Sequence, residues 1–280
     1  MTTESVIAVS GATGHIGRAV AGHLTDTAAR LRLVVRDPDR APTGAWGIVQ
    51  AEYGDLAAAT AALRGAQVLF MVSAAESADR LDQHCTFIDA AADAGVQHVV
   101  YTSFLGASPE ATFTLARDHW ATEQHLRASG MAWTFLRDSF YLDFLPTLAG
   151  SDGVIRGPAA DGQVGAVARE DVARSATAVL SDLDAHAGRT YDLTGPQALT
   201  LAEVARMITD VSGQEVTYVE ESVEQAYESR RHYGVPDWQL DAWVSTYTAI
   251  AAGELAPVTD TVEQLTGTGP IGLVDLLRRP

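Results

Sequence analysis

The sequence predicts an α/β fold, in which helices cover both faces of a mostly parallel sheet and a small α/β lobe follows toward the C-terminus. Three observations support this prediction. Short runs of consecutive apolar residues, typical of strands buried on both faces, alternate with helical patterns through the first half. A glycine-rich turn follows the first run and opens the first helical pattern. The length of 280 residues, with 47% hydrophobic and 20% charged residues, fits a large globular unit.

Seven strands are expected in the central sheet, and the seventh lies well apart from the others in the sequence. The candidate strands are Val6–Ser10, Leu31–Arg36, Ile48–Ala51, Gln67–Val72, His98–Ser103, Ala132–Arg137 and Thr190–Leu193. The helical patterns between them cover His15–Leu24, Ala57–Leu63, Ala78–Ala94 and Phe113–Ala128. Strands that alternate with helices pair in parallel, because each crossover returns the chain to the same end of the sheet.

The second half has a less regular pattern. Gly and Pro residues within Asp138–Gly165 predict a loop-rich excursion over the edge of the sheet. The helix expected at Leu201–Ser212 has Thr200 as its N-cap and Glu203 three residues later, which is a capping box, and Gly213 follows its end. The other elements expected here are helices at Arg169–Leu180 and Trp238–Ala252 and a strand at Glu215–Val219.

The composition excludes several kinds of chemistry. Acidic residues number 36 and basic residues 19, all of them arginine, so the formal net charge is −17. Without lysine, the chain has no Schiff-base lysine, no phosphate-loop lysine and no Tyr-x-x-x-Lys pair. The acidic charge argues against nucleic acid or an anionic membrane as a partner. Cys85 is the single cysteine, so we expect no internal disulfide and no metal site.

The sequence shows no segment that directs or anchors the chain to a membrane. The N-terminal stretch is short and acidic, without the basic and apolar regions of a signal peptide, and no apolar stretch reaches transmembrane length. We therefore expect a cytoplasmic protein without a membrane partner. The oligomeric state stays open, with a homodimer as one alternative.

The glycine-rich turn reads Ser-Gly-Ala-Thr-Gly-His-Ile-Gly. Gly11 allows a tight turn, Gly14 lets the backbone approach a diphosphate, and Gly17 lets the helix pack against the strand. The N–H groups of the first helical turn then attract the phosphates. This predicts a Rossmann-type dinucleotide site whose residues are Gly11, Ala12, Thr13, Gly14, His15, Ile16 and Gly17. The core that carries it is expected at 1–138 and about 166–194, with 139–165 and 195–280 as a substrate-binding lobe.

Arg36 and Asp37 follow the second strand, at the point where this architecture binds the adenosine ribose. A carboxylate there favours NAD by accepting the ribose 2′-hydroxyl, whereas an arginine favours NADP by pairing with a 2′-phosphate. Pro38 biases Asp37 toward an extended or turn conformation, in which Asp37 caps the following turn. We therefore expect Arg36 to be the ligand and NADP(H) the cofactor, with NAD as the alternative.

Further ligands are expected beyond the carboxyl ends of the strands, because open parallel sheets bind ligands there. Asp55 follows the third strand, Ser73 follows the fourth and Ser103 ends the fifth. Each of them has a helix cap or a turn residue as its alternative interpretation. The residues expected near the nicotinamide end of the cofactor are Arg137, Asp138, Ser139 and Phe140.

Motifs along nearly the whole chain carry a family resemblance. The most specific are Leu115–Glu123, which contains His-x-x-x-Glu, and Trp133–Asp138, which reads Trp-Thr-Phe-Leu-Arg-Asp. The others are Ser10–Gly17, Val34–Asp37, Asp93–His98, Tyr101–Ser103, Arg169–Ala173 and Gly234–Pro236. On these residues the chain resembles the NmrA-like, atypical short-chain dehydrogenase/reductases. Within that family it is similar to the quinone oxidoreductase type 2 and triphenylmethane reductase branch.

The resemblance implies an oxidoreductase that reduces a planar conjugated acceptor, such as a quinone, by direct hydride transfer from NADPH. Such an acceptor spreads its charge over a ring system, so the missing Tyr–Lys pair is no obstacle. The candidate catalytic residues are His119 and Phe140. His119 stands where related families have a lysine, and it would orient the ribose or donate a proton, with Glu123 as its neighbour. Its alternative is a helix-face histidine bonded to its surroundings.

Aromatic residues of the lobe are candidates for the wall of a site for a small planar aromatic substrate. They are Phe140, Tyr141, Phe144, Trp238, Trp243 and Tyr247. Ordinary core packing is the alternative for these rings. Two other functions stay open: a non-catalytic NADP(H)-sensing regulator, and a ketoreductase or isomerase of specialised metabolism that uses His119 or Asp138 as its acid. The aromatic cluster favours the reductase, because a sensor needs no second cavity.

Overall fold

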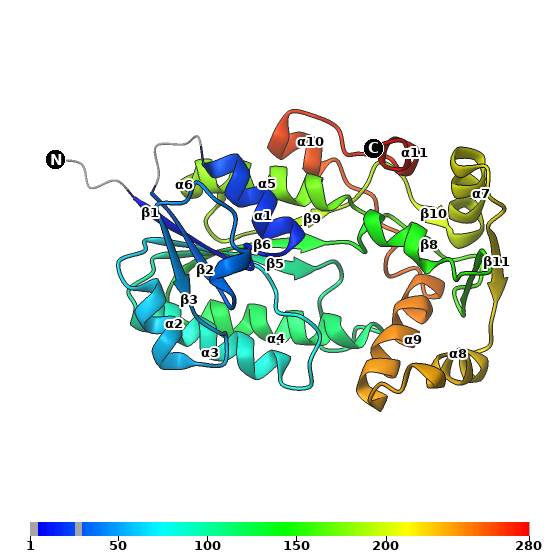
Figure 1. Cartoon of the computed structure of the whole chain (residues 1–280), viewed down its shortest axis with the longest axis horizontal. Coiled ribbons are helices and arrows are strands. Elements are labelled where there is room, and N and C mark those ends of the chain that lie inside the picture. The colour runs from blue at the N-terminus through cyan, green and yellow to red at the C-terminus, as the bar shows by residue number, and fades with distance from the viewer. Residues whose placement is uncertain (1–4, 26–29, 280) are drawn as a thin grey trace. The chain divides into compact units, whose positions relative to one another are not determined.

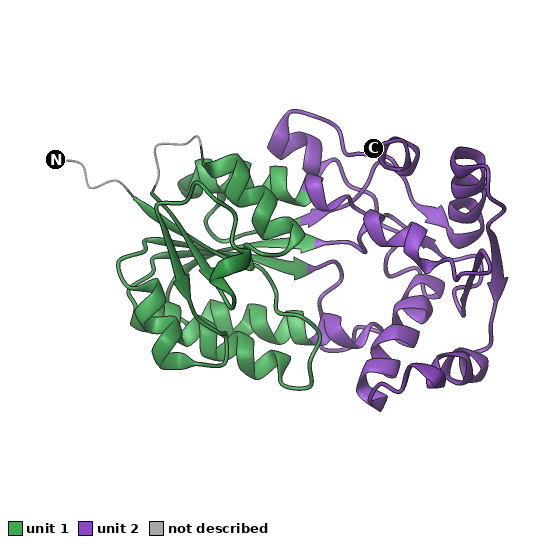
Figure 2. Ribbon diagram, viewed as in Figure 1, with its two compact units in different colours: residues 1–103, 118–137, 172–191 green, residues 104–117, 138–171, 192–280 purple. Residues whose placement is uncertain are grey.

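A computed structural model of the chain describes residues 5–25 and 30–279. Residues 1–4, 26–29 and 280 lie outside this description, and with them most of the N-terminal stretch to which the expectation about a signal peptide refers. The chain divides into two compact units, which Figure 2 colours separately. Unit 1 comprises residues 1–103, 118–137 and 172–191, and unit 2 comprises residues 104–117, 138–171 and 192–280.

A seven-stranded sheet has the order β3-β2-β1-β4-β5-β6-β9 (Figure 1). Its strands are β1 (Val6–Ser10), β2 (Arg30–Val35), β3 (Gly47–Gln50), β4 (Val68–Met71), β5 (His98–Phe104), β6 (Ala132–Asp138) and β9 (Arg189–Leu193). β1 pairs in parallel with β2 and β4, and the pairs β2–β3 and β4–β5 are also parallel. The chain runs from β1 outward to β3 and then returns to β4, so the strand order reverses between β1 and β4. The predicted fold class is therefore confirmed, and ligands of such sheets bind at this reversal.

Helices cover both faces of the sheet, as the sequence predicts. Figure 1 shows α2, α3 and α4 along one face and α1 and α5 along the other. These helices are α1 (His15–Leu24), α2 (Leu56–Leu63), α3 (Arg80–Asp93), α4 (Thr114–Ala128) and α5 (Arg169–Ser181). Both faces of the central strands are thus removed from water, which explains why all five residues of β1 are buried.

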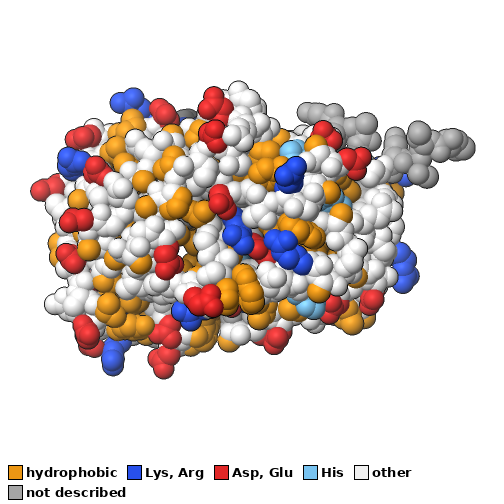
Figure 3. Space-filling model, turned by 180° about the vertical axis from the view of Figure 1, so that it is seen from behind, with side chains coloured by type: hydrophobic (Ala, Val, Ile, Leu, Met, Phe, Trp, Pro, Cys, Tyr) orange, Lys and Arg blue, Asp and Glu red, His pale blue; other side chains and the backbone are white. Residues whose placement is uncertain are grey.

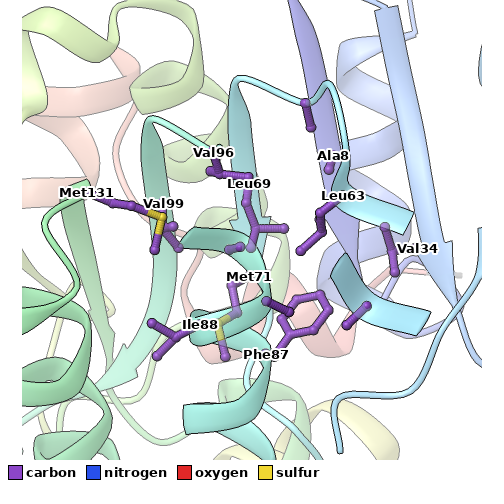
Figure 4. Close-up of a cluster of buried hydrophobic side chains, with 14 of the residues drawn as sticks. Ala8, Val34, Leu63, Leu69, Met71, Phe87, Ile88, Val96, Val99 and Met131 are labelled. Atoms are coloured by element: carbon purple, nitrogen blue, oxygen red, sulfur yellow. The ribbon is translucent and has the colours of Figure 1, made fainter. Parts of the chain in front are cut away.

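The main core of unit 1 lies between the sheet and its helices (Figure 4). Leu69 and Met71 on β4 pack with Phe87 and Ile88 on α3, and none of these four side chains is exposed. Complete burial of an aliphatic or aromatic side chain of this size contributes roughly 2–3 kcal/mol. This packing fixes the strand ends from which the pocket described below is built.

Unit 2 is built from short strands and helices. β7 (Val154–Gly157) pairs in parallel with β11 (Thr217–Glu220), and β8 (Gln163–Val164) pairs antiparallel with β10 (Leu199–Thr200). The prediction of a loop-rich segment over Asp138–Gly165 is therefore wrong in part, because this segment contains β7, β8 and a 3₁₀ helix. The helices of unit 2 are α7 (Leu201–Ser212), α8 (Val223–Arg230), α9 (Asp237–Ala251), α10 (Thr261–Thr266) and α11 (Leu273–Leu277).

The predicted capping box of α7 is confirmed. The Thr200 hydroxyl accepts from the Glu203 N–H, and the Glu203 carboxylate accepts from the Thr200 N–H. Gly213 ends the helix in the left-handed region, with φ of 72°. Both helix ends thereby satisfy groups that a helix leaves without partners.

The surface carries mixed charge. Figure 3 shows acidic and basic side chains interspersed over one face, without one large basic patch. Across residues 5–25 and 30–279, no helix combines the length and apolar character needed to cross a bilayer. Within the same ranges, no group of three or more His, Cys, Asp and Glu side chains has the geometry of a metal site.

Candidate functional site

The glycine turn after β1 has the geometry of a phosphate cradle. Gly11 lies in the left-handed region with φ of 63°, and a Cβ at this position would lie 2.9 Å from Cβ of Val72. A Cβ at Gly17 would lie 2.5 Å from the carbonyl oxygen of Gly11. Gly14 is the N-cap of α1, and no side chain caps the helix there. The N–H groups that begin α1 are therefore available to an anion.

A pocket of about 740 Å³ opens beside this turn, at the carboxyl ends of β1, β2 and β4. All of its lining residues belong to unit 1. Of the predicted turn residues, Gly11, Thr13 and Gly14 line the pocket, whereas Ala12, Ile16 and Gly17 are buried behind it and His15 is exposed. Among the predicted ligands further along the chain, Arg36, Asp55 and Ser73 also line the pocket.

Tyr53 supports the pocket wall and is not among the site residues predicted from the sequence. Its hydroxyl donates to the carbonyl oxygen of Val72 at 2.6 Å and lies within hydrogen-bond distance of the Ser10 hydroxyl. Its ring stacks on Phe87 with a centroid distance of 4.1 Å. Burial raises the pKa of Tyr53, so the phenol stays neutral. The ends of β1 and β4 are thus tied together behind the phosphate-binding turn.

The structure separates the roles of Arg36 and Asp37. The Asp37 carboxylate accepts from the backbone N–H of Asp39 at 3.1 Å and so caps a short 3₁₀ helix at Pro38–Arg40. Arg36 is exposed and lines the pocket. Among the described lining residues, Arg36 carries the only basic side chain. Asp55 has two roles, because it lines the pocket and also caps α2 through the N–H of Ala58 at 2.9 Å.

Buried side chains hold the pocket loop between β4 and α3. The N–H of Ala74 donates to Nε2 of His84 at 2.8 Å, and the carbonyl of Ala74 accepts from Nε of Arg80 at 3.0 Å. One residue earlier, the N–H of Ser73 donates to the Thr102 hydroxyl at 2.8 Å. Arg80 and His84 are both buried, so the loop rests on an interior polar network rather than on solvent.

His119 belongs to the same network. Its Nε2 accepts from the Arg80 guanidinium at 2.8 Å, so the ring proton is on Nδ1, which contacts the Tyr101 hydroxyl at 2.9 Å. Burial and the charge of Arg80 lower the pKa of His119 well below its ordinary value. The ring is therefore neutral at physiological pH, and both of its nitrogens have protein partners.

Glu123, one turn after His119 on α4, pairs with other residues. Its fully buried carboxylate accepts from the Ser103 hydroxyl at 2.6 Å and from two guanidinium nitrogens of Arg137 at 2.7 and 2.8 Å. The structure thus brings two predicted cofactor ligands, Ser103 and Arg137, together on one carboxylate. A bidentate ion pair of this kind holds the Arg137 side chain, near the end of β6, in one position.

The next residues along the chain after Arg137 belong to unit 2 and are Asp138, Ser139, Phe140 and Tyr141. Asp138 and Ser139 are buried, and Oδ2 of Asp138 accepts from the Tyr141 hydroxyl at 3.0 Å. Burial raises the pKa of Asp138 well above its ordinary value. The Phe144 ring lies 6.1 Å from that of Phe140 and 5.8 Å from that of Tyr141, so the structure groups three of the six predicted substrate residues.

The three aromatic residues of α9 have separate surroundings. Tyr247 is buried, its ring fills the space beside Gly157, and the Arg230 guanidinium lies 5.0 Å from the ring centroid. This is the arrangement of core packing, which was the alternative to a substrate contact for this ring. Trp243 packs edge-on against Tyr233 at 5.6 Å, and Trp238 is half-buried at the start of the helix.

A family model described as the NmrA-like family matches residues 3–240. The chain belongs to the NmrA-like family. This membership confirms the resemblance inferred from the motifs, of which Leu115–Glu123 and Trp133–Asp138 are the most specific. The family match covers β1 through the start of α9, and therefore includes the pocket and the Asp138–Phe144 segment.

Members of the family that are similar over nearly the whole length include two named reductases. "Quinone oxidoreductase 2" of Escherichia coli is 36% identical over 270 residues, which is 94% of each chain. "NAD(P)H azoreductase" of Xenophilus azovorans is 33% identical over 94% of this chain and 93% of its own. Among solved structures, triphenylmethane reductase of Citrobacter sp., complexed with NADP(H), has a TM-score of 0.87 and 30% identity. That alignment covers 97% of this chain and 99% of the reductase.

Proposed function

We propose that this protein reduces a quinone or another planar conjugated small molecule with NADPH. Its family and its named relatives support the coarser assignment, an NAD(P)H-dependent oxidoreductase. Quinones, azo compounds and triphenylmethane dyes share delocalised π systems that accept a hydride without strong acid assistance. The observation that carries the proposal is the pocket beside the glycine turn, which combines an uncapped helix start with two positions that only glycine fits.

The residues of the pocket fit NADP(H). Backbone N–H groups at the start of α1 would bind the diphosphate, and the missing Cβ atoms of Gly11 and Gly17 keep that backbone in place. Arg36 would bind the 2′-phosphate, because the neighbouring carboxylate of Asp37 already caps a turn. When bound, NADPH supplies the hydride and both electrons for the reaction.

The polar network behind the pocket would position the cofactor rather than carry out chemistry. His119 accepts from Arg80, Arg80 donates to the Ala74 carbonyl, and His84 accepts from the Ala74 N–H in the pocket loop. A proton donor needs a free N–H directed at its substrate. We therefore retain His119 as a site residue that acts through Arg80, and we assign Phe140 to the aromatic floor beneath the acceptor.

Turnover with different acceptors tests the proposed function. We expect the purified protein to oxidise NADPH in the presence of a naphthoquinone, measured by the loss of NADPH absorbance. Phe140→Ala should lower kcat/KM for the quinone about tenfold through lost ring contact, with NADPH affinity retained. Trp46→Ala, which truncates an exposed ring that does not line the pocket, is the control and should leave turnover unchanged. Tight NADPH binding without turnover of a quinone, an azo compound or a triarylmethane dye would instead favour a sensor.

A further inference from the structure

Two buried polar atoms in unit 2 have no hydrogen-bond partner within the described ranges. They are Oδ1 of Asp138 and the hydroxyl oxygen of Ser139, and both residues are about 1% exposed. A buried carboxyl oxygen without a partner costs stability, so proteins seldom keep one without a function. The other carboxyl oxygen, Oδ2, contacts the Tyr141 hydroxyl at 3.0 Å.

Backbone hydrogen bonds hold the segment from Asp138 to Leu142 in place. The carbonyl of Asp138 accepts from the N–H of Leu105 at 2.9 Å, and the N–H of Ser139 donates to the carbonyl of Leu193 at 3.0 Å. Val167 then pairs with both neighbours of Tyr141, because its N–H donates to Phe140 and its carbonyl accepts from Leu142. The Asp138–Tyr141 pair is therefore fixed in position before any ligand binds, as a catalytic group must be.

Tyr141 connects the buried carboxyl group to the aromatic cluster. Its side chain is half-buried, and its ring lies beside Phe144, which is 41% exposed. The Arg169 guanidinium lies 5.0 Å from the Phe144 ring centroid, and Arg169 also pairs with Asp143 at 3.2 Å. The Tyr141 ring thus lies beside a ring that we assign to a planar acceptor, and its hydroxyl contacts the buried Asp138 carboxyl group.

We infer that Asp138 and Tyr141 form a proton-donating pair, in which Tyr141 protonates the reduced acceptor and Asp138 restores the Tyr141 proton. The inference rests on the proposed function and adds a catalytic residue, Tyr141, and a supporting one, Asp138. Burial disfavours the charged form of the Asp138 carboxyl group, so it raises the pKa of Asp138 and favours the protonated state. In that state the 3.0 Å contact also forms with Asp138 as the donor.

The proton balance of the reaction depends on the acceptor. A neutral quinone takes up a hydride with its two electrons, NADPH becomes NADP⁺, and the resulting hydroquinone anion takes the phenol proton of Tyr141. Tyr141 then recovers a proton from Asp138, and Asp138 recovers one from solvent. A cationic triarylmethane dye takes up the hydride at its central carbon and becomes neutral, so it needs no proton. The pair therefore assists only the first of these two reductions.

The ratio of quinone to dye turnover tests this inference. Tyr141→Phe and Asp138→Asn should each lower kcat for the quinone about tenfold or more relative to kcat for the dye, because general acid assistance is worth at least that much. Tyr227→Phe is the matched control, because its hydroxyl makes the same type of contact with Asp241, at 2.8 Å, at the surface of the same unit. That variant should leave the ratio unchanged.

The outcomes separate the two proposals. If Tyr141→Phe lowers both rates in the same proportion, or neither, the proton-donating pair is wrong while the reductase assignment stands. If the wild type binds NADPH but reduces neither acceptor, the proposed function is wrong and the pair is wrong with it. Where only the quinone is reduced, the solvent deuterium isotope effect on kcat decides. It should change in Tyr141→Phe but not in Tyr227→Phe, and an equal effect in all three proteins contradicts the inference.

Discussion

At the scale of single residues, two glycines of the same helix differ in what a side chain would meet. At Gly17 an added Cβ lies 2.5 Å from a backbone oxygen, which cannot move without shifting the turn. At Gly22, five residues later in α1, nothing lies within 4 Å of the added atom. The helix therefore tolerates a methyl group at one position and excludes it at the other.

Gly17→Ala should lower the free energy of unfolding by about 1–3 kcal/mol, the usual cost of forcing an extra carbon into a packed site. Gly22→Ala should raise it by about 0.5–1 kcal/mol, because alanine favours a helix. Chemical denaturation of both variants and the wild type measures these changes. Equal effects of the two substitutions would show that the close approach at Gly17 does not constrain the turn.

Arg36 gives a second test at this scale. Arg36→Ala should weaken NADPH binding about 10- to 100-fold, the loss expected for a charge-assisted contact with a phosphate, and should change NADH binding little. Arg40→Ala, an exposed arginine that does not line the pocket, is the control. Titration of each variant with both nucleotides provides the four dissociation constants. An equal loss for NADPH and NADH would reassign the ribose contact, with Asp37 as the alternative.

At the scale of elements, the loop between β4 and α3 depends on histidines that must stay neutral. Burial and the nearby Arg80 charge lower the pKa values of His84 and His119 well below the ordinary value. In the unfolded chain the two imidazole rings bind protons below about pH 6.5, whereas in the folded chain they stay neutral to a lower pH. Their contribution to stability is therefore present above that pH and is lost as the pH falls.

We expect the free energy of unfolding to fall below pH 6.5, with a slope of up to about 1.4 kcal/mol per pH unit for each buried histidine. Asp138 acts in the opposite direction, because its raised pKa favours the fold at low pH and loses that effect as the pH rises. His119→Gln should reduce the acid-side slope, and His232→Gln, which replaces an exposed histidine, should not. Urea unfolding at pH 5.5 and 7.5 measures the difference. If the free energy of unfolding changes between these pH values by the same amount in both variants as in the wild type, the buried histidines do not cause the loss of stability.

At the scale of the whole molecule, local signals account for what the sequence predicts well. The strand and helix pattern of the first half follows from consecutive apolar runs, and α7 follows from its capping box and terminal glycine. The short strands β7, β8 and β10 span two to four residues, too few for a periodic pattern to show. Their pairing depends on segments far away in the sequence, such as β11 for β7.

The same reason explains which site residues the sequence leaves undetected. The glycine turn is a local motif, and Arg36 follows from its place after β2. Tyr53 contacts Ser10 across 43 positions, and Arg80 contacts His119 across 39, so topology rather than local pattern brings each pair together. The roles proposed for Phe140, Tyr141 and Asp138 likewise depend on packing that the sequence alone does not specify.

Calorimetric titration of the wild-type protein with NADPH is the decisive experiment, because every proposed role depends on a diphosphate bound at the start of α1. We predict saturable binding with one NADPH per chain, weakened at least tenfold in Gly17→Ala, because a shifted turn misplaces the backbone donors. The absence of heat attributable to NADPH or NADH binding by a folded wild-type protein would contradict the account.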